Sequence, residues 1–135
     1  MNGCFVDTFA FLALLNRNDE AHQRALEAFG KTNRQLVTTR WVLMELADGL
    51  CMPGARIVAA NLIAKIDHEQ RMEVVSLSDE LFVRGMALYR ERADKEWSLT
   101  DCISFIAMED YGIREALTAD HHFEQAGFIA LLKWV

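Results

Sequence analysis

The stretch Ser98–Phe128, SLTDCISFIAMEDYGIREALTADHHFEQAGF, decides the fold because it encodes three elements in close succession. Its apolar spacing and end signals predict a helix over residues 98–112, a strand over 115–118 and a short helix over 121–126. A strand placed between two helices in this way is typical of proteins in which helices cover a parallel sheet. The rest of the chain can be tested against that expectation.

The same alternation runs through the upstream residues. The other expected strands are Gly3–Val6, Gln35–Thr38, Glu73–Ser76 and, at the edge of the sheet, Phe128–Leu132. The other expected helices are Thr8–Leu15, Ala21–Phe29, Trp41–Leu50, Ala55–Glu69 and Ser78–Arg92. Strands that alternate with helices predict an α/β fold, a three-layer α/β/α sandwich with a mainly parallel central sheet.

Composition limits both the architecture and the partners. The chain has 135 residues, of which 52% are hydrophobic, so residues 1–135 are expected to form a single domain. Its formal net charge is -6, which excludes the general attraction to nucleic acid that a basic binding domain exerts. Any contact with nucleic acid must therefore come from a local cluster of basic side chains.

The cysteines indicate the compartment. Cys4, Cys51 and Cys102 are odd in number and lack the C-x-x-C spacing of zinc sites, which favours a reducing cytoplasm. The apolar residues 4–15 do not resemble a signal peptide, because Asp7 interrupts them and no basic leader precedes them. No segment is long enough to span a membrane.

Three aspartates lie where strands and helices meet. Asp7 follows the first strand, Asp101 lies in the first turn of the helix that Ser98 begins, and Asp120 precedes the last helix. Each has a purely structural explanation, since Asp7 and Asp120 stand at helix N-cap positions and Ser98 with Asp101 fits a capping box. Because the carboxyl ends of parallel strands share one edge of a sheet, Asp7 and Asp120 are also expected to converge there.

A fourth acid comes from a helix. Glu45 lies in the otherwise apolar turn Val42–Ala47, where an unpaired buried charge would be costly. An exposed position on the helix is the alternative, and Asp48, one turn further on, could be the inward-facing acid instead. Carboxylates gathered without thiolate or imidazole suit Mg²⁺ or Mn²⁺, and magnesium held this way often binds phosphate as well. The pattern therefore indicates phosphoryl chemistry, in which a metal activates water for in-line attack on a phosphodiester.

The residues resemble the PIN-domain ribonucleases, and in particular bacterial toxins of the VapC kind. The motifs that carry the resemblance are FVDT at Phe5–Thr8, VLMELA at Val42–Ala47, SLTDCISF at Ser98–Phe105 and ALTADHHF at Ala116–Phe123. The resemblance extends over nearly the whole chain. The last two, in this order and spacing, are the more specific.

The resemblance implies a PIN-like fold and a magnesium- or manganese-dependent endoribonuclease. It assigns Asp7, Glu45, Asp101 and Asp120 as the catalytic, metal-binding quartet, with Thr8 and Thr118 in support. It also implies that the chain is a toxin, a homodimer that a cognate antitoxin neutralises. An apolar groove along the helices after Asp7 and Ala21 is expected to accept the antitoxin.

The residues also bear on three other functions. A phosphatase or phospho-acceptor domain is disfavoured, because Asp7 is followed by Thr8-Phe9 and not by the second acid of a D-x-D motif. The triplet Asp120-His121-His122 is similar to that of DHH phosphoesterases, but the further upstream aspartate motifs of that family are missing, so both histidines are expected to be surface or supporting residues. A PIN-like scaffold that binds a partner without cutting RNA is the remaining alternative.

Overall fold

Five parallel strands form the centre of the molecule. In the computed structural model, which describes residues 3–133, the strands are β1 (Cys4–Val6), β2 (Leu36–Thr39), β3 (Met72–Val75), β4 (Glu115–Leu117) and β5 (Ile129–Ala130). Their order across the sheet is β3-β2-β1-β4-β5, and every neighbouring pair is parallel. The expected α/β architecture with a parallel sheet is confirmed.

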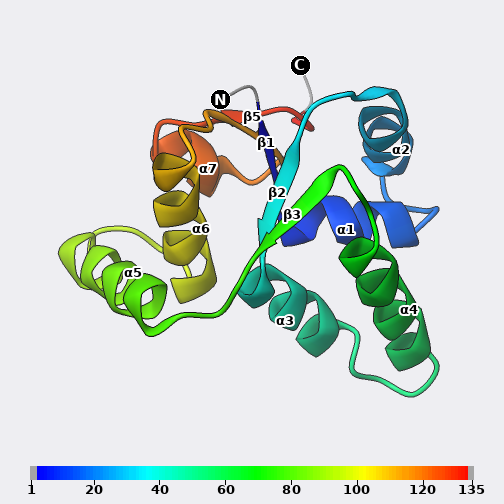
Figure 1. Cartoon of the computed structure of the whole chain (residues 1–135), viewed down its shortest axis with the longest axis horizontal. Helices are drawn as coiled ribbons and strands as arrows, with labels where there is room; N and C mark the ends of the chain where they lie inside the picture. Colours follow the sequence, from blue (N-terminus) through cyan, green and yellow to red (C-terminus); the bar gives the residue numbers. More distant parts are fainter. Residues whose placement is uncertain (1–2, 134–135) are drawn as a thin grey trace.

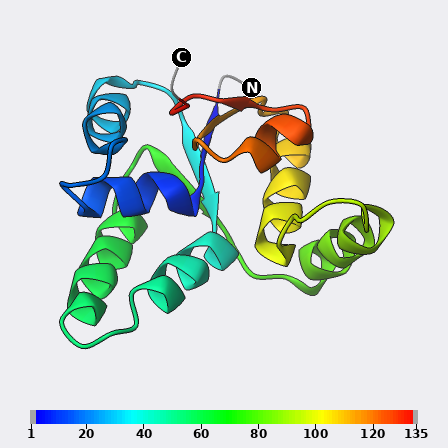
Figure 2. The same ribbon diagram turned by 180° about the vertical axis from the view of Figure 1, so that it is seen from behind.

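Helices cover both faces of the sheet. They are α1 (Thr8–Leu15), α2 (His22–Lys31), α3 (Arg40–Gly49), α4 (Ala55–Asp67), α5 (Asp79–Glu91), α6 (Leu99–Asp110) and α7 (His121–Gln125). Figure 1 shows α5, α6 and α7 on one side of the strands and α1, α2 and α4 on the other, with α3 beyond one end of the sheet. The view from behind shows the same three layers (Figure 2). Within residues 3–133, no helix combines the length and the apolarity that a membrane span requires.

The chain reverses direction across the sheet beside β1. From β1 it moves to β2 and β3 on one side, and it then returns through α5 and α6 to β4 and β5 on the other side. The carboxyl ends of β1 and β4 therefore border the crevice where open α/β sheets bind their ligands.

Local signals in the sequence explain most of the boundaries. The hydroxyl of Ser78 accepts a hydrogen bond from the Leu81 N-H at 3.1 Å and caps α5, as predicted. Two expectations were wrong in detail. Gly30 does not end α2, because its backbone stays outside the left-handed region and the helix continues to Lys31. The edge strand β5 spans two residues, whereas the apolar run suggested five.

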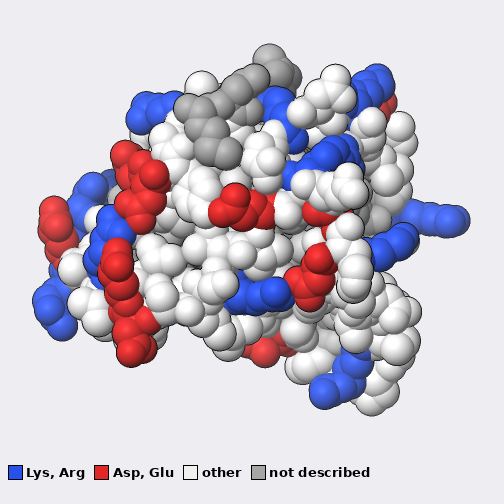
Figure 3. Space-filling view, viewed as in Figure 1, with Lys and Arg blue, Asp and Glu red and all other residues white. Residues whose placement is uncertain are grey.

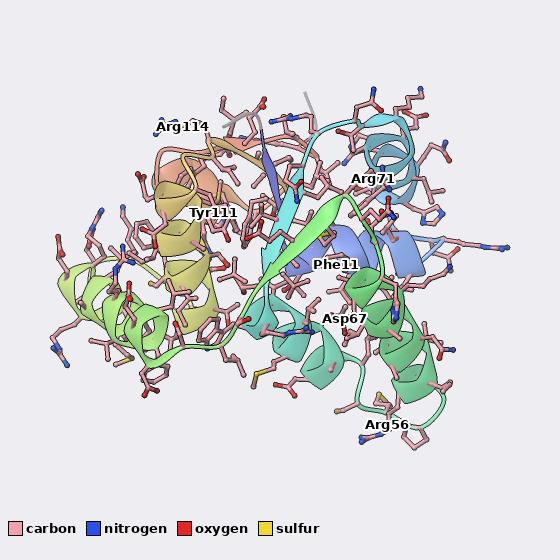
Figure 4. The ribbon with its side chains drawn as sticks, in the orientation of Figure 1. Phe11, Arg56, Asp67, Arg71, Tyr111 and Arg114 are labelled. Carbon is pink, nitrogen blue, oxygen red and sulfur yellow. The ribbon has the colours of Figure 1, made fainter. Side chains whose placement is uncertain are left out.

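Aromatic side chains join the layers. The ring of Phe105 on α6 meets the ring of Phe123 on α7 edge to face, with 5.0 Å between centroids, and Phe123 in turn lies 6.3 Å from Phe5 on β1. On the opposite face, Phe11 of α1 is buried and its ring lies 6.1 Å from that of Phe29 (Figure 4). The first two contacts fix α7 against α6 and β1, and the third holds α1 against α2.

Arg71 joins α2 to the start of β3. It lies in the turn that leads into that strand (Figure 4), and its guanidinium donates to the carbonyl oxygens of Phe29 at 2.6 Å and Thr32 at 3.2 Å. Carbonyl groups at the end of α2 that lack helical partners are thereby satisfied.

Gly85 allows α5 to pack closely on α6. A Cβ atom at this position would lie 2.4 Å from Cγ1 of Ile103, which is fully buried. We therefore expect Gly85→Ala to lower the free energy of unfolding by about 1–3 kcal/mol, measured by urea denaturation. Gly30→Ala is the control, because nothing lies within 4 Å of its Cβ position and a helical alanine should be neutral or slightly stabilising. Equal stability of the two variants would contradict the close packing.

Candidate functional site

Asp7 lies at the end of β1 and its carboxylate does not cap the following helix. It occupies the N-cap position of α1 but makes no side-chain capping bond. Its Oδ2 instead accepts a hydrogen bond from the Thr118 hydroxyl at 2.9 Å, and the residue is only 5% exposed. The helix-capping explanation of Asp7 is therefore wrong, and a buried acid remains to be explained.

Thr118 connects two of the aspartates across the strand ends. Its hydroxyl donates to Asp7 and accepts from the backbone N-H of Asp120 at 3.1 Å. Asp120 also caps α7, because its Oδ1 accepts from the His122 N-H at 2.9 Å. For Asp120, then, capping and a place beside Asp7 are both observed.

Asp101 is held by a capping box. Its Oδ2 accepts from the Ser98 N-H at 3.2 Å, while the Ser98 hydroxyl accepts from the Asp101 N-H at 3.0 Å. The structural role predicted from the sequence is thus observed. Among residues 3–133, no group bonds to the second oxygen, Oδ1, so the capping role leaves it available to a ligand.

Glu45 approaches the three aspartates from α3. This helix begins directly after β2, where the Thr39 hydroxyl accepts from the Val42 N-H at 3.1 Å. The Glu45 carboxylate accepts a short hydrogen bond from the Thr8 hydroxyl at the start of α1. Asp48, by contrast, is exposed and lines a separate cavity of about 620 Å³ beside α4, so the structure favours Glu45 as the inward-facing acid.

Three of the four carboxylates have raised pKa values. Burial raises the pKa of Asp7 to about 7, the Thr118 hydrogen bond lowers it in part, and the charges of Asp101 and Glu45 raise it further. The pKa values of Glu45 and Asp101 are also raised, in both cases mainly by burial, with Asp120 adding repulsion. The four acids therefore share one electrostatic environment that resists a full set of negative charges.

Histidine is the only basic side chain that pairs with these carboxylates within residues 3–133. Within residues 3–133, every ion pair of these four carboxylates involves His121 or His122. Nδ1 of His122 lies 3.3 Å from both Asp101 Oδ2 and Asp120 Oδ1, whereas His121 is 67% exposed at its side chain. The two histidines therefore differ: His121 is a surface residue and His122 is a supporting residue. The sequence did not indicate that His122 contacts two of the acids.

The donor set fits a hard divalent cation. Carboxylate and hydroxyl oxygens dominate the site, and lysine and arginine are absent from its described ion pairs, so a cation would relieve the repulsion. Among the described residues, Asp120, His121 and His122 form the group whose ligand atoms all lie within 4.8 Å of one another, and Asp120 is the member that it shares with the four acids. Oxygen ligands favour Mg²⁺, and participation of an imidazole would shift the preference towards Mn²⁺.

The chain is similar to known proteins over most of its length. Residues 4–129 match the family described as PIN domain. The structure is similar to that of Mycobacterium tuberculosis VapC20, described as a toxin that cleaves the sarcin-ricin loop, with 27% identity, a TM-score of 0.84 and coverage of 93% of this chain and 96% of that one. No curated protein sequence matches the chain.

Two further solved structures share the fold at lower identity. VapBC2 from Rickettsia felis, bound to a promoter DNA fragment, has 15% identity and a TM-score of 0.67, with coverage of 95% of this chain and 96% of that one. FitAcB from Neisseria gonorrhoeae has 12% identity and a TM-score of 0.65, with 94% of each chain covered.

Proposed function

This chain belongs to the PIN domain family, and from that premise we propose that it is a metal-dependent endoribonuclease, the toxin of a toxin-antitoxin pair. The proposed catalytic and metal-binding residues are Asp7, Glu45, Asp101 and Asp120, with Mg²⁺ or Mn²⁺ as cofactor. The substrate is RNA, and the bond that is hydrolysed is a phosphodiester.

The convergence of the four carboxylates carries the proposal. They come from four segments of the chain, namely the end of β1, α3, α6 and the N-cap of α7, and their charges act on one another. Helix capping accounts for Asp101 and Asp120 but not for the buried Asp7 or for Glu45. A scaffold without catalysis would gain nothing from this costly arrangement, since unpaired buried charges destabilise a fold.

Hydroxyl and backbone donors hold the four acids in position before any metal ion binds. Thr118 fixes Asp7, Thr8 fixes Glu45, the Ser98 N-H fixes Asp101 and the His122 N-H fixes Asp120. Such supporting bonds keep ligands in place and reduce the reorganisation that binding and catalysis would otherwise require. When bound, a divalent cation would supply a Lewis acid that promotes attack of water on phosphorus and stabilises charge on the leaving oxygen.

The toxin assignment is supported by the similarity to VapC20, a named toxin, and to complexes such as VapBC2. We propose an antitoxin protein as partner and a homodimer as the assembled state. Apolar side chains support such contacts, because Leu15 of α1 with Val58 and Leu62 of α4 line a surface hollow of about 750 Å³. A second hollow of about 530 Å³ is lined by Phe11 and Leu14 of α1 and by Phe29 of α2, and we propose that the antitoxin segment binds along these helices.

We also propose a cytoplasmic location and a single-domain organisation. All three cysteines are free, and Cys4 and Cys102 are buried, which agrees with a reducing cytoplasm. We propose that residues 1–135 form one PIN-like domain, because the family match spans 4–129 and one apolar core extends from β1 to Leu132.

The direct test is cleavage of a mixed RNA pool by the purified chain, freed of any bound partner. We expect cuts with Mg²⁺ or Mn²⁺ and none with EDTA. A folded protein that cuts no RNA under any metal condition would favour the protein-binding scaffold instead.

Thr118→Val tests the support of Asp7. The change keeps the side-chain volume and removes the hydroxyl that bonds to Asp7 and Asp120, so we expect cleavage to slow by about 10–100-fold. Thr118→Ser keeps the hydroxyl and should retain most of the activity. Equal rates for the two variants, from single-turnover kinetics, would show that the hydroxyl does not position the site.

A further inference from the structure

A cleft of about 540 Å³ lies between the second half of α5 and the segment that leads to α6. Tyr89, Arg90, Lys95 and Trp97 are among the residues that line it. We propose that this cleft binds RNA at a nucleotide beyond the two that flank the cleaved phosphodiester, with the base on Tyr89 and a phosphate on Arg90 and Lys95. This inference rests on the proposed ribonuclease function. It adds the place where part of the RNA substrate binds.

One wall of the cleft is joined to the acidic site. Trp97 is followed directly by Ser98, whose N-H donates to Asp101 Oδ2 at 3.2 Å. The indole N-H of Trp97 also donates to Gln125 at 2.9 Å, on the helix α7 that begins after Asp120. A single residue thus connects the cleft to the segments that carry two of the four acids, so a strand bound at the acids can continue into the cleft.

The cleft offers a ring and a cation to a ligand. Tyr89 is 49% exposed, so one face of its ring can stack on a base. Arg90 is exposed, and among residues 3–133 no carboxylate lies within the 4.0 Å of an ion pair with it. Lys95 reaches the Asp94 carboxylate only at 3.6 Å, a weak exposed pair that a phosphate can replace.

Arg92, which lies next to the cleft, already has partners within the protein. Arg92 bonds to both oxygens of Asp94, at 3.0 and 3.2 Å, and its guanidinium lies 5.1 Å from the Trp97 ring centre. These contacts hold Trp97 as a rigid wall of the cleft. They leave Tyr89, Arg90 and Lys95 as the groups that can meet a nucleotide.

RNA is the ligand that the groups lining the cleft favour. The chain carries a net charge of -6, and over α5 acidic and basic side chains alternate without forming a broad basic face (Figure 3). A polyanion would therefore need a local contact next to the catalytic acids, and this cleft combines basic groups with an aromatic ring, as single-strand binding requires. Glu96 also lines the cleft and opposes an anion, so its removal should strengthen RNA binding.

The test compares cleavage of a long single-stranded RNA with cleavage of a dinucleotide that cannot reach the cleft. For Arg90→Ala with Lys95→Ala, we expect KM for the long RNA to rise at least tenfold with kcat unchanged, and the dinucleotide to be cut at the wild-type rate. Tyr89→Ala should raise KM about tenfold. Glu96→Gln should lower it.

The control removes two cations elsewhere. Arg56 and Lys65 lie on α4, and Figure 4 shows Arg56 on the side of the molecule opposite α5. Arg56→Ala with Lys65→Ala should leave KM for the long RNA unchanged. An equal rise in KM for the two double variants would mean that only net charge matters and would overturn the proposal.

Binding in EDTA separates this inference from the proposed function. Fluorescence anisotropy of a labelled single-stranded RNA should show binding to the wild-type protein that weakens at least tenfold in Arg90→Ala with Lys95→Ala. Unchanged RNA affinity and unchanged KM would overturn the cleft assignment. Absence of cleavage by the wild-type protein, with RNA still held by the cleft, would instead overturn the ribonuclease function.

Discussion

Replacement of Asp7 by asparagine is expected to slow RNA cleavage by at least about 100-fold while the fold stays intact. The amide has the shape of the carboxylate, and its oxygen can still accept the hydrogen bond from Thr118. What is lost is the negative charge that makes Asp7 a ligand for a divalent cation. Single-turnover cleavage with saturating Mg²⁺ measures the loss, and circular dichroism verifies the fold.

Asp48→Asn is the matched control, because it makes the same chemical change on an exposed residue of α3. Its cleavage rate should equal that of the wild-type protein. If Asp7→Asn cuts RNA at the wild-type rate, or if Asp48→Asn is as damaging, the assignment of the acidic site is wrong.

The second large effect is on the stability of the metal-free protein. The pKa of Asp7 rises from 3.8 to about 7 on folding, so the folded state binds this proton more tightly than the unfolded chain does. The stabilisation from protonated Asp7 is complete below about pH 4 and is lost as the pH rises to about 7. We expect this group to lower the free energy of unfolding by on the order of 4 kcal/mol across that window.

Urea denaturation in EDTA between pH 4 and pH 8, for the wild-type protein and for Asp7→Asn, measures this contribution. The difference between the two curves gives the contribution of Asp7 together with its repulsion of Glu45 and Asp101, whose pKa values are also raised. The mutant should lose less stability as the pH rises and should be the more stable protein at pH 8. Parallel curves would show that Asp7 carries no such penalty.

Metal binding should restore the stability that the wild-type protein loses at high pH. At pH 8, Mg²⁺ at about 100 times its dissociation constant would add about 2.7 kcal/mol to the free energy of unfolding. Asp7→Asn should gain much less.

The sequence predicted the sheet and its helices because the signals involved are local. Short apolar runs end in turns, and serine or threonine caps begin α3, α5 and α6. The error at Gly30 has the same origin, since a glycine permits a helix to end but does not require it. The two-residue length of β5 is set by pairing with β4, which no local pattern records.

The site was less predictable, because its contacts link residues far apart in the chain. Asp7 and Asp120 both stand at helix N-caps, yet only Asp120 uses its side chain as a cap. The bond from Thr118 to Asp7 spans 111 positions and decides the difference. Likewise the choice between Glu45 and Asp48 depends on the Thr8 hydroxyl, which lies on another helix.

Direct measurement of Mn²⁺ binding tests the central claim, that these four acids form a divalent-cation site. Electron paramagnetic resonance of free Mn²⁺ during a titration would give the affinity for the wild-type protein, Asp7→Asn, Asp101→Asn and Asp48→Asn. We predict saturable binding by the wild-type protein and Asp48→Asn, and at least tenfold weaker binding by the other two. Wild-type protein that binds no Mn²⁺, or affinity that is unchanged in Asp7→Asn and Asp101→Asn, would contradict it.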